Sequence, residues 1–427
     1  MSEPGLTLVA TQPRTLTMLD QAALWGNLGI GLLGPVTAVY VVAPGMSLLA
    51  AFTAVVAGTL IGTAGLALAN AAGARTGKPA MVMLRGLFGA KLSYFPTILN
   101  LVQLLGWAVF ELVVIAAAAR ALLPWDSDWL SIVFAGALTT LMAIRPLGVV
   151  RVLRRYALIA VTLATAYLLW RLPLPELTNG GWNGFWPGAD LVIAVSVSWI
   201  PLAADYARHS RTELGAAVGS FAGYSVSQIA AYSLGLLAFS TVAIADPSQD
   251  GIFAALVAVP LGWLAFGVLA VRELDASFAD VYSTAISIQN LRPMADRRVL
   301  AVIVGATATV LALVLNINDY VSFLYLLGAV FVPLFAVFVV RYFVFGGHRD
   351  WDTSADARPR YALLMPLLLG FVAYQLVNPG QISWWSRFWG DAREALHLTL
   401  PDWLSASLVS FAVAFAATLV LGRPATR

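Results

Sequence analysis

The sequence predicts an all-α integral membrane protein with twelve transmembrane helices. Of its 427 residues, 60% are hydrophobic and only 11% are charged, whereas about a quarter of the residues in a soluble domain are charged. The mean hydropathy is +0.83. A membrane span needs ~20 apolar residues, and apolar runs of that length recur along the chain. These runs are continuous rather than alternating, which argues against a membrane β-barrel. The composition therefore excludes a soluble enzyme, a disordered scaffold and a nucleic-acid-binding module.

Twelve hydrophobic segments account for the expected spans. They cover residues 22–43, 46–71, 94–122, 129–145, 149–171, 189–208, 213–243, 258–290, 298–317, 321–345, 360–377 and 402–421. Two further segments are not expected to cross the membrane. Residues 79–91 are too short and predict an amphipathic cytoplasmic helix, and the Trp-rich segment 378–401 predicts an aromatic belt at the membrane interface.

Loop charge predicts the orientation of the chain. Basic residues follow every even-numbered span, beginning with Arg75, Lys78, Arg85 and Lys91 after span 46–71. Loops after the odd-numbered spans are acidic or nearly free of basic residues, apart from the mixed last one. Because cytoplasmic loops carry an excess of Lys and Arg, we expect a multi-pass protein of the inner (plasma) membrane with both termini in the cytoplasm.

Span 22–43 is expected to be broken. Four glycines between residues 26 and 34 precede Pro35, and both residue types weaken a helix. Broken helices of transporters offer free backbone groups to substrate and ion, so we expect Asn27 and Gly29 to contact substrate and Gly31 to contact the coupling ion. Close helix packing through small residues is the alternative.

Span 189–208 carries a second candidate break, where Ser196, Ser198 and Trp199 precede Pro201. The two candidate breaks are five spans apart, as in two five-helix halves with inverted topology. We therefore expect a tail over 1–21, a first repeat over 22–171, a second repeat over 189–345, two more helices over 360–421 and a tail over 422–427.

Span 94–122 places Gln103, Trp107 and Glu111 at positions i, i+4 and i+8, which stacks them on one helix face. An ionisable residue inside a span costs at least ~2.5–3.5 kcal/mol on insertion scales and indicates a functional site. We therefore expect Glu111 to belong to a functional site. A structural hydrogen bond of Glu111 to a neighbouring helix is the alternative.

Span 258–290 holds the densest set of charges. Arg272, Glu273, Asp275 and Asp280 fall within nine residues of an otherwise apolar run. On a continuous helix Arg272 and Asp275 are close enough to pair, and Asp280 lies two turns from Arg272 on roughly the same side. We expect a charged patch inside the bundle, with Asp280 at the substrate and the other three in an ion-coupling network.

Several short stretches, taken in their order and spacing along the chain, resemble the nucleobase–cation symporter family 1, the cytosine permease and hydantoin transporter group. They are Gly73–Gly77, Arg85 to Gly89, Gln103 to Trp107, Ala204–Arg208, Tyr282 to Asn290, and Asn318–Tyr320 through Pro333. The resemblance implies a LeuT-like fold of two inverted five-helix repeats plus two helices. It also implies that Trp107 stacks on a planar heterocycle and that Glu111 stands where hydantoin transporters have a glutamine that hydrogen-bonds the ring. Cytosine permeases place their glutamine three residues before the tryptophan, and Gln103, which lies four residues before it, is the candidate for that substrate contact here. Positions matching other substrate contacts are Val195, Ser196 and Ser198, with Trp199 adjacent.

The sodium site of that family is where this sequence departs from the pattern. Positions that carry hydroxyl groups in sodium-coupled members align here with Arg272, Asp275 and Ala276. A shift of three or four residues would instead bring Ser277 or Ser283 to the site. The departure predicts sodium-independent uptake, either proton-coupled or facilitated. A carboxylate among Glu111, Glu273, Asp275 and Asp280 would then carry the proton.

The sequence thus predicts a secondary transporter, not an enzyme, that imports a planar nitrogen heterocycle across a lipid bilayer. A pyrimidine, a purine or a hydroxymethylpyrimidine-type thiamine precursor fits, and the pattern from Glu273 to Thr284 is similar to the proposed hydroxymethylpyrimidine branch. The alternatives are a sodium-coupled nucleobase or hydantoin symporter and an amino-acid or amine transporter of the same fold. With no Cys, three scattered His and no phosphate-binding loop, we expect no metal, no cofactor and no nucleic-acid partner.

Overall fold

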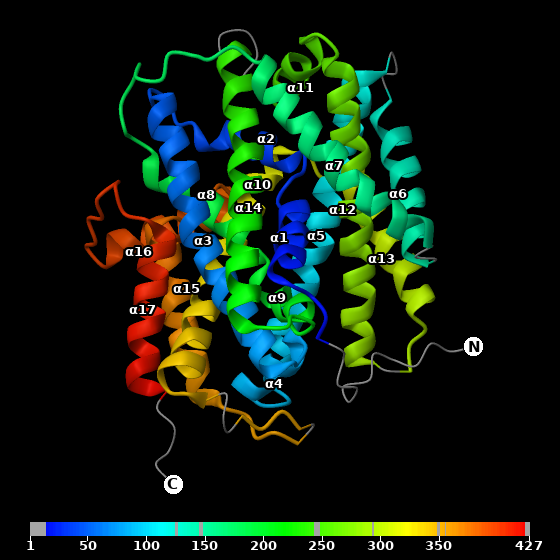
Figure 1. Cartoon of the computed structure of the whole chain (residues 1–427). Helices are drawn as coiled ribbons and strands as arrows, with labels where there is room; N and C mark the ends of the chain where they lie inside the picture. Colours follow the sequence, from blue (N-terminus) through cyan, green and yellow to red (C-terminus); the bar gives the residue numbers. More distant parts are fainter. Residues whose placement is uncertain are drawn as a thin grey trace.

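Helices make up the regular structure of the chain (Figure 1). The computed structural model describes residues 14–422 apart from 124–126, 145–147, 243–247, 293, 348–350 and 355. Most of the predicted tails 1–21 and 422–427 therefore lies outside the described residues. Within those described ranges, strand-like pairing is limited to two isolated bridges, Leu16 with Ser210 and Met46 with Gly181. The prediction of an all-α protein is confirmed.

The first half of the chain contains three short helices, α1, α2 and α4, and four longer ones. They are α1 (Met18–Leu28), α2 (Leu33–Val41), α3 (Leu48–Thr76), α4 (Ala80–Phe88), α5 (Tyr94–Leu122), α6 (Asp128–Ile144) and α7 (Gly148–Arg171). The chain bends by 67° between α1 and α2. Its α4 falls within the segment from which the sequence predicts an amphipathic helix.

The second half has a similar order. It contains α8 (Phe185–Ser198), α9 (Ile200–Ala207), α10 (Glu213–Val242), α11 (Gln249–Ala258), α12 (Gly262–Leu291), α13 (Arg297–Ala312) and α14 (Asn318–Val339), which runs into the π-helix η1 (Val340–Val344). Between α8 and α9 only Trp199 interrupts the helix, and its backbone stays right-handed helical. The 3-10 turn η3 (Tyr361–Leu363), α15 (Leu364–Val377), α16 (Ser383–Ala395) and α17 (Ala406–Leu421) follow.

The two halves place their short connecting helices at opposite ends of the bundle. In each half a short helix lies between the first and second long helices, α4 between α3 and α5, and α11 between α10 and α12. Figure 1 shows α4 at the lower end and α11 at the upper end. The halves also interlock, because α10 packs against α1 and α3, and α3 packs against α8.

Four described helices are long and apolar enough to cross a membrane, by length and composition. They are Leu48–Thr76, Tyr94–Leu122, Phe185–Ala207 and Asn318–Val344, and the bent pair of α1 and α2 makes a fifth if it is one span. Polarity is inverted relative to a soluble protein. Phe134, Val226 and Val314 are about 70% exposed on the outside, whereas charged side chains are buried inside, an arrangement typical of a protein surrounded by lipid.

Candidate functional site

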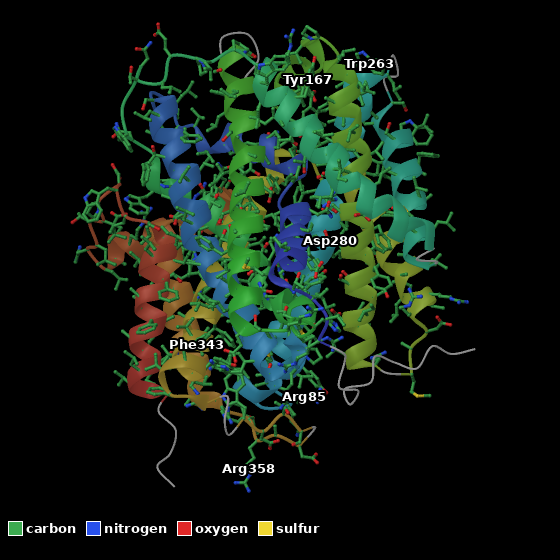
Figure 2. The ribbon with its side chains drawn as sticks, in the orientation of Figure 1. Arg85, Tyr167, Trp263, Asp280, Phe343 and Arg358 are labelled. Atoms are coloured by element: carbon green, nitrogen blue, oxygen red, sulfur yellow. The ribbon has the colours of Figure 1, made fainter. Side chains whose placement is uncertain are left out.

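A cavity of about 80 Å³ lies at the break between α1 and α2. Side chains of α2, α5, α8, α10, α12 and α14 enclose it, together with the backbone from Leu28 to Gly34. Figure 2 shows Asp280, one of its lining residues, about midway between the two ends of the bundle. The cavity is therefore deep inside the protein, where polar groups are shielded from bulk water.

Two neighbouring side chains of α12 hold the two ends of the break. The Arg272 guanidinium donates from Nη2 to the carbonyl of Asn27 in the last turn of α1, at 2.8 Å. Glu273 Oε2 accepts from the Leu32 N–H at 2.9 Å, and its carboxylate also accepts from the Leu33 N–H at the start of α2. Each charge lies at the helix end whose dipole it complements. The adjacent charges of α12 thus stabilise both half-helices.

Two of the predicted glycines let neighbouring helices approach the break closely. A Cβ on Gly31 would lie 3.0 Å from Glu273 Oε2, and one on Gly29 would lie 2.1 Å from Ser227 Oγ of α10. A side chain at Gly29 would therefore collide with α10, and one at Gly31 would press on the Glu273 carboxylate. Both glycines line the cavity, as does Leu28 beside them.

The carboxyl groups of Glu111 on α5 and Asp280 on α12 lie next to each other. An ionised carboxylate has no proton to donate, so the two groups can hydrogen-bond to each other only with a proton on one of them. Each residue is only 6% exposed, and both line the cavity. The positive charge of Arg272 also acts on both carboxyl groups.

Hydrogen-bonding capacity is left unused in this cavity. Among the described residues, Glu111 Oε2 and the Nε and Nη1 atoms of Arg272 are buried without a hydrogen-bond partner. Leaving a buried polar group unpaired costs ~1–3 kcal/mol, and more if it is charged. Two residues of the cavity wall, Glu111 and Arg272, thus have an acceptor and donors that no described protein group satisfies.

Indole rings from two sides border the same space. Trp107 of α5 is packed edge-on against Tyr320 and Phe323 of α14, with ring centroids 6.0 and 5.3 Å away. Trp199, at the junction of α8 and α9, makes an edge contact with Trp25 at 6.0 Å. Both indoles line the cavity, so its wall includes aromatic surface on two sides.

The structure gathers most of the sequence-predicted site residues around this cavity. Those in its lining are Gly29, Gly31, Trp107, Glu111, Val195, Trp199, Arg272, Glu273 and Asp280, whereas Asn27, Gln103, Ser196, Ser198 and Asp275 are not in the lining. Gln103 instead donates to the Ser198 carbonyl at 2.8 Å, which ties α5 to the end of α8. Ser196 donates to Gln228 Oε1 at 2.8 Å. These side chains hold the walls of the cavity in place.

Sequence reasoning missed the contribution of α10. Tyr224, Gln228 and Tyr232 all line the cavity and are spaced i, i+4 and i+8, the same one-face pattern that singled out the polar stripe of α5. That signal was present in span 213–243. Tyr320 of α14 and Thr37 of α2 were also missed, and their hydroxyl groups are hydrogen-bonded to each other at 3.0 Å.

The chain is similar in sequence to known permeases. Residues 9–355 match the sequence profile of the family described as permeases for cytosine/purines, uracil, thiamine and allantoin. Over 364 residues the chain is 26% identical to the putative purine-cytosine permease YxlA of Bacillus subtilis (strain 168). The match covers 79% of this chain and 78% of YxlA.

Solved transporter structures share the fold. Mhp1, a nucleobase-cation-symport-1 family transporter, has been solved in a closed conformation with bromovinylhydantoin bound. That structure superposes on this chain with a TM-score of 0.72 and 15% identity, and the match covers 97% of this chain and 96% of that one. Its inward-facing conformation gives a TM-score of 0.73, 15% identity, and coverage of 99% and 94%. A Na+-coupled sialic acid symporter gives 0.56, 11% identity, and 94% of each chain.

Proposed function

Because the chain belongs to the family of permeases for cytosine/purines, uracil, thiamine and allantoin, we propose that it imports a planar nitrogen heterocycle without the help of sodium. Membership of a permease family makes it a multi-pass membrane transporter. The cavity at the break is the substrate site of this proposal, and alternating access exposes it to one side of the membrane at a time.

The observation that carries the proposal is the pairing of aromatic walls with unused hydrogen-bonding groups in one cavity. Trp107 and Trp199 offer ring faces, Glu111 Oε2 offers an acceptor, and Arg272 offers donors. Base–aromatic stacking contributes ~1–3 kcal/mol per base in other systems. A nucleobase or a related pyrimidine has a flat ring with N–H and carbonyl groups at its edge, and so uses all of these groups together.

Sodium independence rests on the position of Arg272. Its guanidinium donates to the Asn27 carbonyl at the end of α1, where the family resemblance places the backbone ligands of sodium. A guanidinium has donors only and is always charged, so it supplies a fixed positive charge at this carbonyl. The like charge disfavours a metal cation beside it.

We also propose twelve spans, with helices α1–α7 and α8–α14 forming two inverted repeats, and a cytoplasmic lower end. The opposite placement of α4 and α11 supports the inversion (Figure 1). Arg85 and Arg358 lie at the lower end (Figure 2). Near the N-terminus, the N–H of Leu16 donates to the His209 carbonyl, and the Leu16 carbonyl accepts from the Arg211 N–H. Basic residues mark the cytoplasmic side of membrane proteins.

Uptake into proteoliposomes tests this proposal. The probes are radiolabelled cytosine, adenine, uracil, thiamine, allantoin and hydroxymethylpyrimidine, the last because of the pattern on α12. At least one is taken up, and Trp107→Ala raises its apparent KM about tenfold or more, since a 1.4 kcal/mol loss is a factor of ten. Trp107→Phe keeps part of the affinity.

The matched control is Trp170→Ala. Trp170 lies on α7 with 74% of its surface exposed and is not in the cavity lining, so its loss leaves the apparent KM unchanged. An unchanged KM in Trp107→Ala would place the substrate elsewhere, and a wild-type protein that transports none of the six compounds would overturn the proposed function.

A further inference from the structure

Four carboxyl groups are near the charged segment of α12, and the structure separates their roles. Glu273 already accepts from two backbone N–H groups at the start of α2, and protonating it would weaken the cap on that half-helix. Asp275 is half-buried and not in the cavity lining. Glu111 and Asp280 remain, and their carboxyl groups lie next to each other in the cavity wall.

We propose that the Glu111–Asp280 carboxyl pair carries one proton together with each substrate molecule. This inference rests on the proposed function and adds the coupling ion and its binding site. The geometry supplies the proton's position, because two buried carboxyl groups lie next to each other in the cavity wall and can hydrogen-bond to each other only while one of them is protonated. Both carboxyl groups also line the cavity, so the proton and the substrate would share one cavity.

Desolvation links the proton to the substrate. Both carboxyl groups line the cavity that the substrate is proposed to fill. A substrate that displaces water from the cavity raises the cost of a second negative charge, because burial and a neighbouring like charge both disfavour ionisation of a carboxyl group. The substrate therefore binds together with the shared proton. Loss of the proton turns the pair into two adjacent anions that repel each other.

The surroundings of the pair allow it to lose the proton as well as to hold it. Arg272 is the cation of α12 that acts on the pair, and Glu273 is the carboxylate of the same helix that also acts on it. Tyr224 and Tyr232 of α10 and Tyr320 of α14 are the other titratable side chains of the cavity. The fixed guanidinium charge stabilises the ionised pair after release. In one cycle a proton passes from outside water to the pair and from the pair to inside water, and the substrate is unchanged.

The experiment uses full-length protein in proteoliposomes, with choline in place of sodium and the membrane potential held at zero with potassium and valinomycin. The probe is whichever of the six labelled compounds the wild type transports. With the lumen one pH unit more alkaline, one-to-one coupling concentrates the label about tenfold, the ratio set by one pH unit. Asp280→Asn and Glu111→Gln lose this accumulation to a ratio near one but keep exchange of external label for internal unlabelled compound.

Asp275→Asn is the control on the same helix and keeps the tenfold accumulation. Gradient-driven accumulation by both Asp280→Asn and Glu111→Gln overturns the proton role of the pair. A wild type that equilibrates the label but never concentrates it also overturns this role and leaves the proposed function standing. A wild type that neither binds nor transports any of the compounds overturns the proposed function, and the proton role with it.

A binding measurement on the wild type covers the case in which both variants fail to fold. If only the protonated pair binds substrate, the apparent Kd rises with falling occupancy of that state, by about tenfold per pH unit once the proton is lost. A Kd that stays constant from pH 5 to pH 10 overturns the proposal without any variant.

Discussion

Removing the Glu273 carboxylate should destabilise the protein far more than removing its charge alone. In Glu273→Ala the N–H groups of Leu32 and Leu33 lose their acceptor, in an interior where the side chain that capped them is 1% exposed. Each unpaired donor costs ~1–3 kcal/mol, or roughly 2–6 kcal/mol for both. Glu273→Gln keeps an amide oxygen as acceptor and loses only the charge–dipole attraction, up to ~2 kcal/mol.

Thermal unfolding in detergent, followed by tryptophan fluorescence, measures this difference. A loss of 1 kcal/mol lowers the Tm of a domain of 150–250 residues by ~2–4 °C, and by less in a longer chain. We expect Glu273→Ala to melt several degrees below Glu273→Gln, which melts near the wild type. Glu213→Ala is the control, because Glu213 forms an ion pair with Arg75 at the surface, where such pairs contribute ~0–1 kcal/mol. Equal melting of Glu273→Ala and the wild type would refute the capping role.

Three further predictions concern stability and use the same melting assay. Asp190 accepts hydrogen bonds from the first residues of α17, so Asp190→Ala should cost ~2 kcal/mol or more, and a Tm within 1 °C of the wild type would contradict this. Gly73→Ala should cost ~1–3 kcal/mol, because its Cβ would lie 2.6 Å from the Ala204 Cα. Gly390→Ala in α16 meets nothing within 4 Å and should stabilise the protein by ~0.5–1 kcal/mol. A higher Tm for Gly73→Ala than for Gly390→Ala would refute the close packing of α3 on α9. Arg120→Ala breaks only exposed ion pairs and should change stability by ~1 kcal/mol or less; a large loss would reveal a role that these pairs do not explain.

Sequence periodicity predicted the site residues that share one helix. The spacing of Trp107 and Glu111 on α5, and of Arg272 and Asp280 on α12, directs these side chains to one face each, and both faces line the cavity. The break at Gly29 to Gly31 followed from the weak helix propensity of its residues. Each of these inferences depends on local backbone geometry, which neighbouring residues in the sequence determine.

Contacts between distant segments could not be predicted in this way. The sequence offered Gln103 as a substrate ligand, but its amide binds the Ser198 carbonyl 95 residues away. Four carboxylates were equivalent candidates for the proton, and only the packing of α5 against α12 joins Glu111 to Asp280. Asp275 is five residues from Asp280, and a rotation of 100° per residue on the helix turns it away from that face.

Uptake with sodium replaced by choline tests the central claim most directly. The claim is that Arg272, bound to the Asn27 carbonyl at 2.8 Å, supplies the positive charge that sodium would otherwise bring to the break. The account predicts that the initial rate of heterocycle uptake is the same in choline as in sodium, at fixed pH on both sides of the membrane. A strict sodium requirement, with a rate that saturates as the sodium concentration rises, would contradict it.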